Sequence, residues 1–187
     1  MSAGETARKN YESARNELVQ RIQLREQILL FFVGGVATIY SVALGAENKL
    51  EILLAIPYLS FGTAVIISQH NSVIGALGHF CAHEIGPFLK KLAPSEYAPF
   101  WESSASLHRH SVKALGMRTL AHVVLIITPA ALGLLMNWRY ARFSDMTNGT
   151  IWWIGATGTV LALWFLISAH RLRRKLYREI EWQDIAR

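Results

Sequence analysis

Four long apolar blocks without a charged residue constrain this chain more than any other feature. They occupy 28–45, 52–68, 120–136 and 151–169, and none contains Asp, Glu, Lys or Arg. A helix needs about 20 apolar residues to cross roughly 30 Å of hydrocarbon, and each block nearly reaches that length before its flanks are added. A soluble bundle this small could not cover four helices that are apolar all round. We therefore predict an all-α integral membrane protein with four transmembrane helices.

Basic side chains are divided unequally among the segments that connect these blocks. Sixteen of the 19 Lys and Arg residues lie in 1–26, in 69–118 and after 169, whereas the short loops 46–50 and 137–149 hold the other three. Since Lys and Arg accumulate on the cytoplasmic side of a membrane, we expect both termini and 69–118 to be cytoplasmic. The whole formal net charge of +6 then lies on that side. The polar first 26 residues do not form a signal peptide.

The blocks and their flanks predict five consecutive segments. These are a cytoplasmic N-terminal helix (1–26), transmembrane helices 1 and 2 (27–70), a cytoplasmic helical extension and loop (71–116), transmembrane helices 3 and 4 (117–170), and a basic cytoplasmic C-terminal helix (171–187).

Local signals predict where the helices begin and bend. Ser2 and Glu5 fit a capping box, in which each side chain bonds the other residue's backbone N–H. The first helix continues into the first span without Gly or Pro, and an apolar stripe on its N-terminal half predicts that it packs on another helix. We expect Pro57 to kink the second span and Pro87 to end the helix that continues from it. The stripe comprises Tyr11, Ala14, Leu18 and Ile22.

The interior of the spans favours a pore over a coupled carrier. Ion-coupled transporters usually place charged side chains at membrane depth, and no span here contains Asp, Glu, Lys or Arg. A pore can instead be lined by hydroxyl groups and backbone, although Ser and Thr also bond back to their own helix. The segment "GATGTVLA" has small residues four apart, which indicates close helix packing either within one subunit or between subunits. The predicted pore-lining residues are Thr38, Ser41, Thr157 and Thr159.

The stretch "GALGHFCAHEIGPF" raises the question of a metal. His79 and His83 are four apart, so they share a helix face at the spacing of two metal ligands. Cys81 and Glu84 lie off that face. Membrane di-metal oxygenases need several such histidine boxes, and "HRH" at 108–110 is the only other cluster. We favour histidines that cap, stack or contact anions over a catalytic metal or a structural metal between subunits. Since nucleophile and phosphate-binding motifs are also missing, we expect no enzyme, metal or cofactor.

A dense basic cluster follows the fourth block. It supports two interpretations: a topology signal that binds anionic lipid headgroups, or a site for the phosphates of a nucleotide or oligonucleotide. In the second, histidine and aromatic side chains would stack on bases. The predicted ligand-binding residues are Arg171, Arg173, Arg174, Lys175, Arg178, His79 and His83.

The strings "RIQLREQILLFFVGGVATIYSVALG", "QHNSVIGALGHF" and "FWESS" resemble a family of small bacterial inner-membrane proteins over roughly 20–105. The four-span plan is similar to membrane effectors of anti-phage defence of the Hailong type. Those are oligomeric channels held shut by a bound DNA oligomer, and their opening depolarises the infected cell. The resemblance implies a homo-oligomer, with a tetramer as the first guess, a nucleotide or DNA oligomer ligand and a soluble defence partner.

The sequence leaves three functions open. We expect a ligand-gated pore in anti-phage defence, because the spans are uncharged and rich in small residues and the charge excess is on one side. The alternative is a membrane anchor that recruits a soluble partner to its cytoplasmic helices. A membrane metalloenzyme with histidine ligands is the third, and the single histidine pair supports it least.

Overall fold

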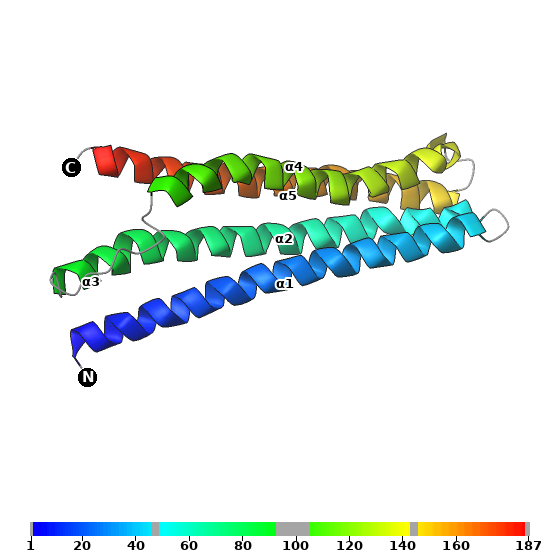
Figure 1. Ribbon diagram of the computed structural model, residues 1–187. Helices are drawn as coiled ribbons and strands as arrows, with labels where there is room; N and C mark the ends of the chain where they lie inside the picture. Colours follow the sequence, from blue (N-terminus) through cyan, green and yellow to red (C-terminus); the bar gives the residue numbers. More distant parts are fainter. Residues whose placement is uncertain (1, 46–48, 93–104, 143–145, 186–187) are drawn as a thin grey trace. The chain divides into compact units, whose positions relative to one another are not determined.

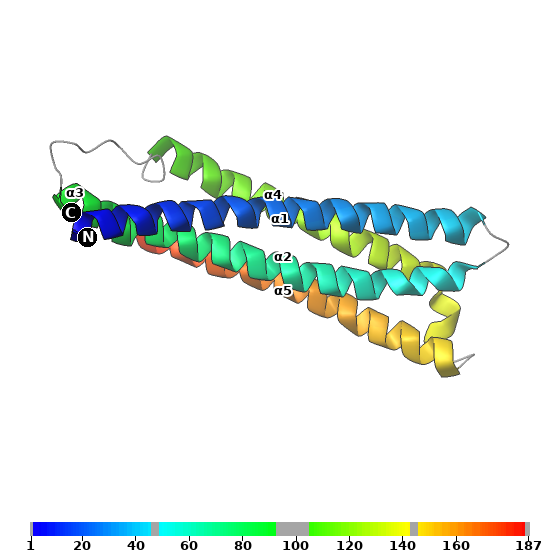
Figure 2. The ribbon, with the colours of Figure 1, turned by 90° about the horizontal axis from the view of Figure 1, so that it is seen from below.

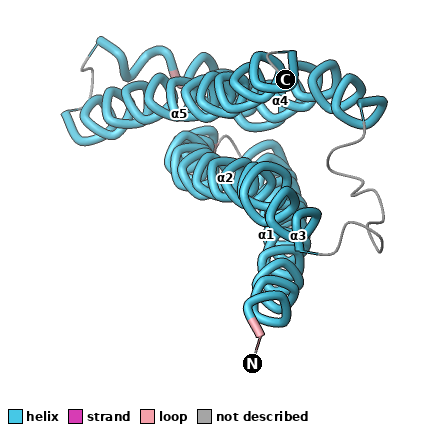
Figure 3. Tube along the Cα trace, turned by 90° about the vertical axis from the view of Figure 1, so that its left-hand side faces the viewer, coloured by secondary structure: helices cyan, strands magenta, loops and turns pink. Residues whose placement is uncertain are grey.

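The computed structural model describes residues 2–45, 49–92, 105–142 and 146–185, with side chains at 105–114 and 176–185 left aside. All elements of this described part are helical, as Figure 3 shows. Four of its helices are long and apolar enough to cross a membrane. The prediction of an all-α fold with four spans is therefore confirmed, and the chain is a multi-pass membrane protein.

Long helices and shorter helical elements follow one another along the described chain (Figure 1). In chain order they are α1 (Ala3–Gly45), η1 (Leu50–Ala55), α2 (Ile56–His79), η2 (Phe80–Ile85), α3 (Gly86–Leu92), α4 (Ala105–Met136), η5 (Trp138–Arg142) and α5 (Met146–Ile185).

The first helix begins as its sequence predicts. Ser2 N–H donates to Glu5 Oε2 at 2.9 Å, and Glu5 N–H donates to Ser2 Oγ at 3.3 Å. This capping box satisfies two backbone donors that the first helical turn leaves without partners. α1 then runs unbroken to Gly45. Ala14 and Leu18 of the predicted stripe are buried, and Tyr11 and Ile22 are half-buried, so the stripe is a packed face.

The chain separates into two compact units. Unit 2 comprises Arg25–Ser68 and Arg118–Ser168 and contains all four apolar blocks except the last residue of the fourth. Unit 1 comprises Met1–Leu24, Gln69–Met117 and Ala169–Arg187, and it holds most of the charged residues. The apolar blocks therefore lie in one unit, and most of the charged residues lie in the other.

Unit 2 is held together by an apolar core and by side chains that bond carbonyls of neighbouring helices. Phe32, Ile56 and Ile126 belong to one buried cluster that draws on α1, α2, α4 and α5. Tyr40 Oη donates to Pro129 O at 3.0 Å, and Ser60 Oγ donates to Ile126 O at 2.9 Å. These two bonds join α1 and α2 to α4.

Glycine lets the helices of unit 2 approach closely. A Cβ on Gly133 of α4 would lie 2.9 Å from the Leu53 carbonyl oxygen, and one on Gly155 of α5 would lie 3.1 Å from Pro57 Cβ. Gly158 also faces α2, where a Cβ would make an ordinary contact with Phe61 Cβ at 3.6 Å. The small residues of "GATGTVLA" thus pack α5 against α2 within one copy of the chain, and the two helices run together in Figure 2.

The structure places both prolines near the start of a helix, and most of the predicted loop lies outside the described residues. Pro57 is the second residue of α2, after the 3₁₀ turn η1, so it lies where its missing N–H breaks no helical bond. Pro87 is the second residue of α3, which follows the π turn η2 and continues to Leu92. Of the predicted helical extension and loop (71–116), residues 93–104 lie outside the described part, and α4 begins at Ala105.

Candidate functional site

Small and hydroxyl side chains form a line on the outer side of α1. Gly34, Thr38, Ser41 and Gly45 are all exposed, and their spacing places them on one helix face. A Cβ on Gly34 or Gly45 would meet nothing within 4 Å. Thr38 Oγ1 donates to Gly34 O at 2.9 Å, so its hydroxyl is satisfied within the helix. We call these four residues the α1 line.

The exposed face of α5 has a different character. Val160 is 68% exposed and Trp164 is 58% exposed, and Trp153 and Ile154 are exposed as well. Thr157 lies on this face among large apolar neighbours. Such a surface is typical of contact with lipid tails, which are themselves apolar.

The four predicted pore-lining residues therefore do not share one surface. Thr38 and Ser41 lie on the α1 line, and Thr157 lies on the apolar face of α5. Thr159 is buried within unit 2, where Oγ1 donates to Gly155 O at 2.9 Å.

The basic end of α5 belongs to unit 1. Arg171, Arg174 and Lys175 are exposed and Arg173 is half-buried. Arg178 continues the same helix, but its side chain lies outside the described set. The guanidinium and ammonium groups offer several donors to an anion and no acceptor.

The histidine pair lies in unit 1 as well, at the junction of α2 and the π turn η2. The ring centroids of His79 and His83 are 4.9 Å apart, and the ring planes are tilted by 38°. Both side chains are half-buried, whereas Cys81 between them is 1% exposed. In the described part of the chain, no group of three His, Cys, Asp or Glu residues is placed to hold a metal ion.

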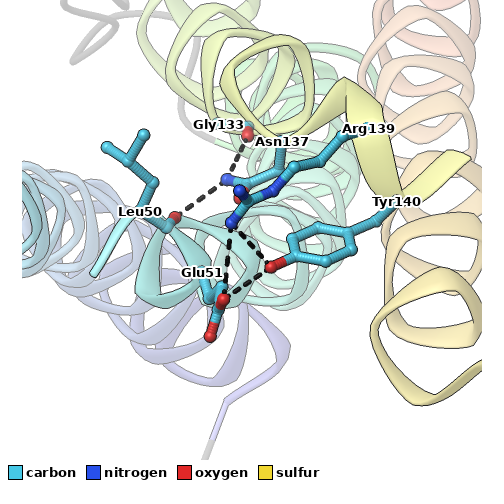
Figure 4. Close-up of polar contacts among 6 residues, drawn as sticks. All are labelled: Leu50, Glu51, Gly133, Asn137, Arg139 and Tyr140. Carbon is cyan, nitrogen blue, oxygen red and sulfur yellow. Dashed lines mark hydrogen bonds and ion pairs between the residues drawn. The ribbon is translucent and has the colours of Figure 1, made fainter. Parts of the chain in front are cut away.

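A polar network that the sequence did not predict closes one end of unit 2 (Figure 4). Asn137 follows the last residue of α4 and is fully buried. Its Nδ2 donates to Leu50 O at 2.8 Å and to Gly133 O at 2.9 Å. One side chain thus ties the end of α4 to η1. A lone Asn directly after an apolar block was the available signal, since Asn often ends helices.

Three further residues complete this network (Figure 4). Tyr140 Oη donates to Glu51 Oε1 at 2.5 Å, and Arg139 Nη2 donates to Tyr140 Oη at 2.8 Å. Arg139 and Glu51 also form an ion pair at 3.5 Å. The hydrogen bond to the Glu51 carboxylate, followed by burial, raises the pKa of Tyr140 above its usual value. Arg139 and Glu51 therefore join η5 to η1.

Arg25 is the second residue whose role the sequence did not reveal. It is only 2% exposed, and its Nη2 lies 2.5 Å from Glu26 Oε1. His122 of α4 is buried in the same unit. A guanidinium this deeply buried needs a paired charge and hydrogen bonds, so Arg25 is part of the packed interior of unit 2.

Comparisons with known proteins leave the chain without an assigned family. The resemblance to anti-phage membrane effectors therefore stays a prediction from sequence. No protein-family model matches the chain, and searches of curated proteins and of solved structures found no match either.

Proposed function

We propose that the chain forms a homo-oligomeric pore in a bacterial inner membrane, in which the α1 line of each copy faces a shared axis. The observation that carries this proposal is the α1 line itself, an exposed run of Gly and hydroxyl residues on a helix whose other flank is packed. Bulky apolar side chains cover the exposed face of α5, whereas on α1 the exposed Leu30, Phe31 and Leu44 flank the α1 line. Two faces of one bundle that differ in this way suit two different neighbours.

Membrane physics favours a protein neighbour for the α1 line. Small residues let helix backbones approach, and this packing drives helix association in lipid. Hydroxyl groups and exposed backbone can also replace part of an ion's hydration shell. Lipid tails gain nothing comparable from a small-residue surface. The α1 line therefore supports either contact between copies or a water-filled passage at their axis, and a pore contains both.

The basic end of α5 is the proposed control site. In an oligomer Arg171, Arg174 and Lys175 would recur once per copy, which multiplies the favourable interactions with a polyanion. The phosphates of a nucleotide or oligonucleotide fit this surface, and His79 and His83 could stack on bases. Since α5 runs unbroken from unit 2 into unit 1, a ligand on its basic end would act on a helix of the proposed pore.

Measurement of ion flux in proteoliposomes tests both the pore and the control site. We expect flux through the purified protein that changes when a short single-stranded DNA oligomer is added to the side bearing the basic end of α5. In Arg173→Gln/Arg174→Gln the DNA effect should disappear and binding should depend less on salt. Lys90→Gln/Lys91→Gln removes the same charge elsewhere in unit 1 and should keep the effect.

Each negative result has a separate meaning. No flux with or without DNA contradicts the pore. Flux that responds equally to DNA in both double variants contradicts the control site and leaves the pore intact.

The defence role rests on the resemblance and needs its own experiment. A bacterium that expresses the chain together with its neighbouring genes should resist phage plating and should depolarise after infection. Variants that abolish flux should lose both effects. Resistance that persists without flux would separate the chain from the effector mechanism.

A membrane anchor is the second candidate, and exposed apolar residues of unit 1 favour it. Phe88 and Leu92 of α3 and Val19 and Leu24 of α1 are exposed, and surfaces of this kind mark protein contacts. The anchor predicts one soluble partner in fixed ratio, lost in Phe88→Glu/Leu92→Glu, and no ion flux. A soluble defence partner would fit this alternative.

A further inference from the structure

We propose that His79 and His83 chelate one divalent transition-metal ion of the type that imidazole binds, such as Zn²⁺. The proposal does not rest on the pore. It gives the two histidines a role other than stacking on the bases of the proposed control ligand. It rests on the geometry of the two rings and on the turn that holds them.

The ring geometry suits a single ion. A Zn–N bond is about 2.0–2.1 Å, and with about 1 Å from ring nitrogen to ring centre, two rings on one tetrahedral ion have centroids about 5 Å apart. The centroids of His79 and His83 are 4.9 Å apart. The planes are tilted by 38°, so the rings are not stacked flat on each other. Because residues four apart share a helix face, rotation of both side chains would bring one nitrogen of each ring to a common ion.

The π turn contributes to this geometry. Gly86 N–H bonds to Cys81 O, five residues back, instead of four. A π turn is wider and flatter than an α turn, so residues four apart lie closer along the axis, and such turns occur frequently at functional sites. A π turn is also an uncommon choice for a segment whose role is packing alone. Its position, directly after His79 and including His83, links the unusual backbone to the histidine pair.

The surroundings define what kind of site this is. Both histidines are half-buried, so an ion has access, whereas Cys81 is buried and cannot reach it. No third protein ligand joins them in the described part of the chain. Two imidazoles leave coordination positions for water or for the same pair of a second copy. The site should therefore exchange its ion, unlike a closed structural zinc site with four protein ligands.

Zn²⁺ titration by calorimetry on protein without a polyhistidine tag tests the proposal. We expect one ion per chain, or one per two chains when two copies share it. His79→Gln and His83→Gln should each weaken binding by about 100-fold, since the chelate gain is lost. Lowering the pH from about 7.5 to about 5.5 should also weaken it, since protons compete for the nitrogens.

Control variants separate this pair from the other histidines. His170→Gln lies in the same unit and should bind as the parent does, and so should His108→Gln/His110→Gln. Melting temperatures measured without metal should be equal for all variants, which shows that each one folds.

Cu²⁺ as a spectroscopic probe counts the ligands directly. Electron spin echo modulation should show two imidazoles per Cu²⁺ in the parent and one in either single variant. One imidazole in the parent, or unchanged Zn²⁺ affinity in His79→Gln/His83→Gln, would overturn the proposal.

Discussion

The exposed faces of α1 and α5 belong to the same unit and meet opposite requirements. α5 presents Val160 and Trp164, which are large and apolar. α1 presents the α1 line, with the exposed Leu30 and Phe31 beside it. Hydropathy does not distinguish them, since both helices are apolar enough to cross a membrane. The difference lies in side-chain size and hydroxyl content. The average hydropathy of a helix therefore shows that it can span a membrane, and the side chains on each of its faces indicate whether that face contacts lipid or protein.

The largest effect on ion flux should come from giving the α1 line large apolar side chains like those of α5. In Thr38→Leu/Ser41→Leu we expect ion flux to fall by about tenfold or more, because an apolar constriction dewets. Thr157→Leu, which adds the same kind of side chain to α5, should leave flux unchanged. Equal losses in the two variants would mean that the faces do not differ in function.

Glycine substitutions sharpen the comparison through stability. Gly133→Ala puts a methyl 2.9 Å from the Leu53 carbonyl oxygen, and such overpacking costs about 1–3 kcal/mol. Gly34→Ala and Gly62→Ala place it where nothing lies within 4 Å. The free energy of unfolding, measured by titration of mixed micelles with SDS, should fall only for Gly133→Ala. Gly34→Ala should instead weaken the oligomer, and Gly62→Ala should change neither quantity.

Mutation of the network in Figure 4 tests how much it stabilises unit 2. This test does not involve the exposed faces of α1 and α5. Asn137→Ala removes the side-chain hydrogen bonds to the partly buried Leu50 carbonyl and to Gly133 O, which costs about 1–3 kcal/mol. Thr150→Ala removes an exposed bond to Met146 O and serves as the control. Comparable unfolding free energies for both variants would show that Asn137 does not tie α4 to η1.

The smallest expected effect concerns the exposed part of the same network. Because the Glu51 carboxylate is the main cause of the raised pKa of Tyr140, Glu51→Gln should lower that pKa toward its usual value. A raised folded-state pKa stabilises the fold below the unfolded value near 10 and loses this contribution as the pH rises through the folded value. At neutral pH the stability loss should be at most about 1 kcal/mol.

Absorbance of ionised tyrosine during an alkaline titration measures this shift, with Tyr140→Phe identifying the signal. A Tyr140 transition that occurs at the same pH in the parent and in Glu51→Gln would contradict the assigned cause.

Much of the fold could be predicted because its signals are local. The four blocks and the Ser2–Glu5 capping box each depend on residues within one segment. The role of Asn137 could not be predicted, because its partner Leu50 is 87 residues away. Which face of each span is buried could not be predicted either, because a helix that is apolar all round has no polar side to orient it. Thr159 and Thr38 therefore look alike in sequence, although one is buried and the other exposed.

Cysteine accessibility tests the central claim, that the α1 line faces a water-filled axis, most directly. In a Cys81→Ser background, Thr38→Cys, Ser41→Cys and Thr157→Cys would be treated with a charged, membrane-impermeant thiosulfonate while ion flux is recorded. We predict that the reagent blocks flux through the Thr38 and Ser41 variants and leaves the Thr157 variant unaffected. Block only at Thr157, or modification at none of the three while ions pass, would contradict the account.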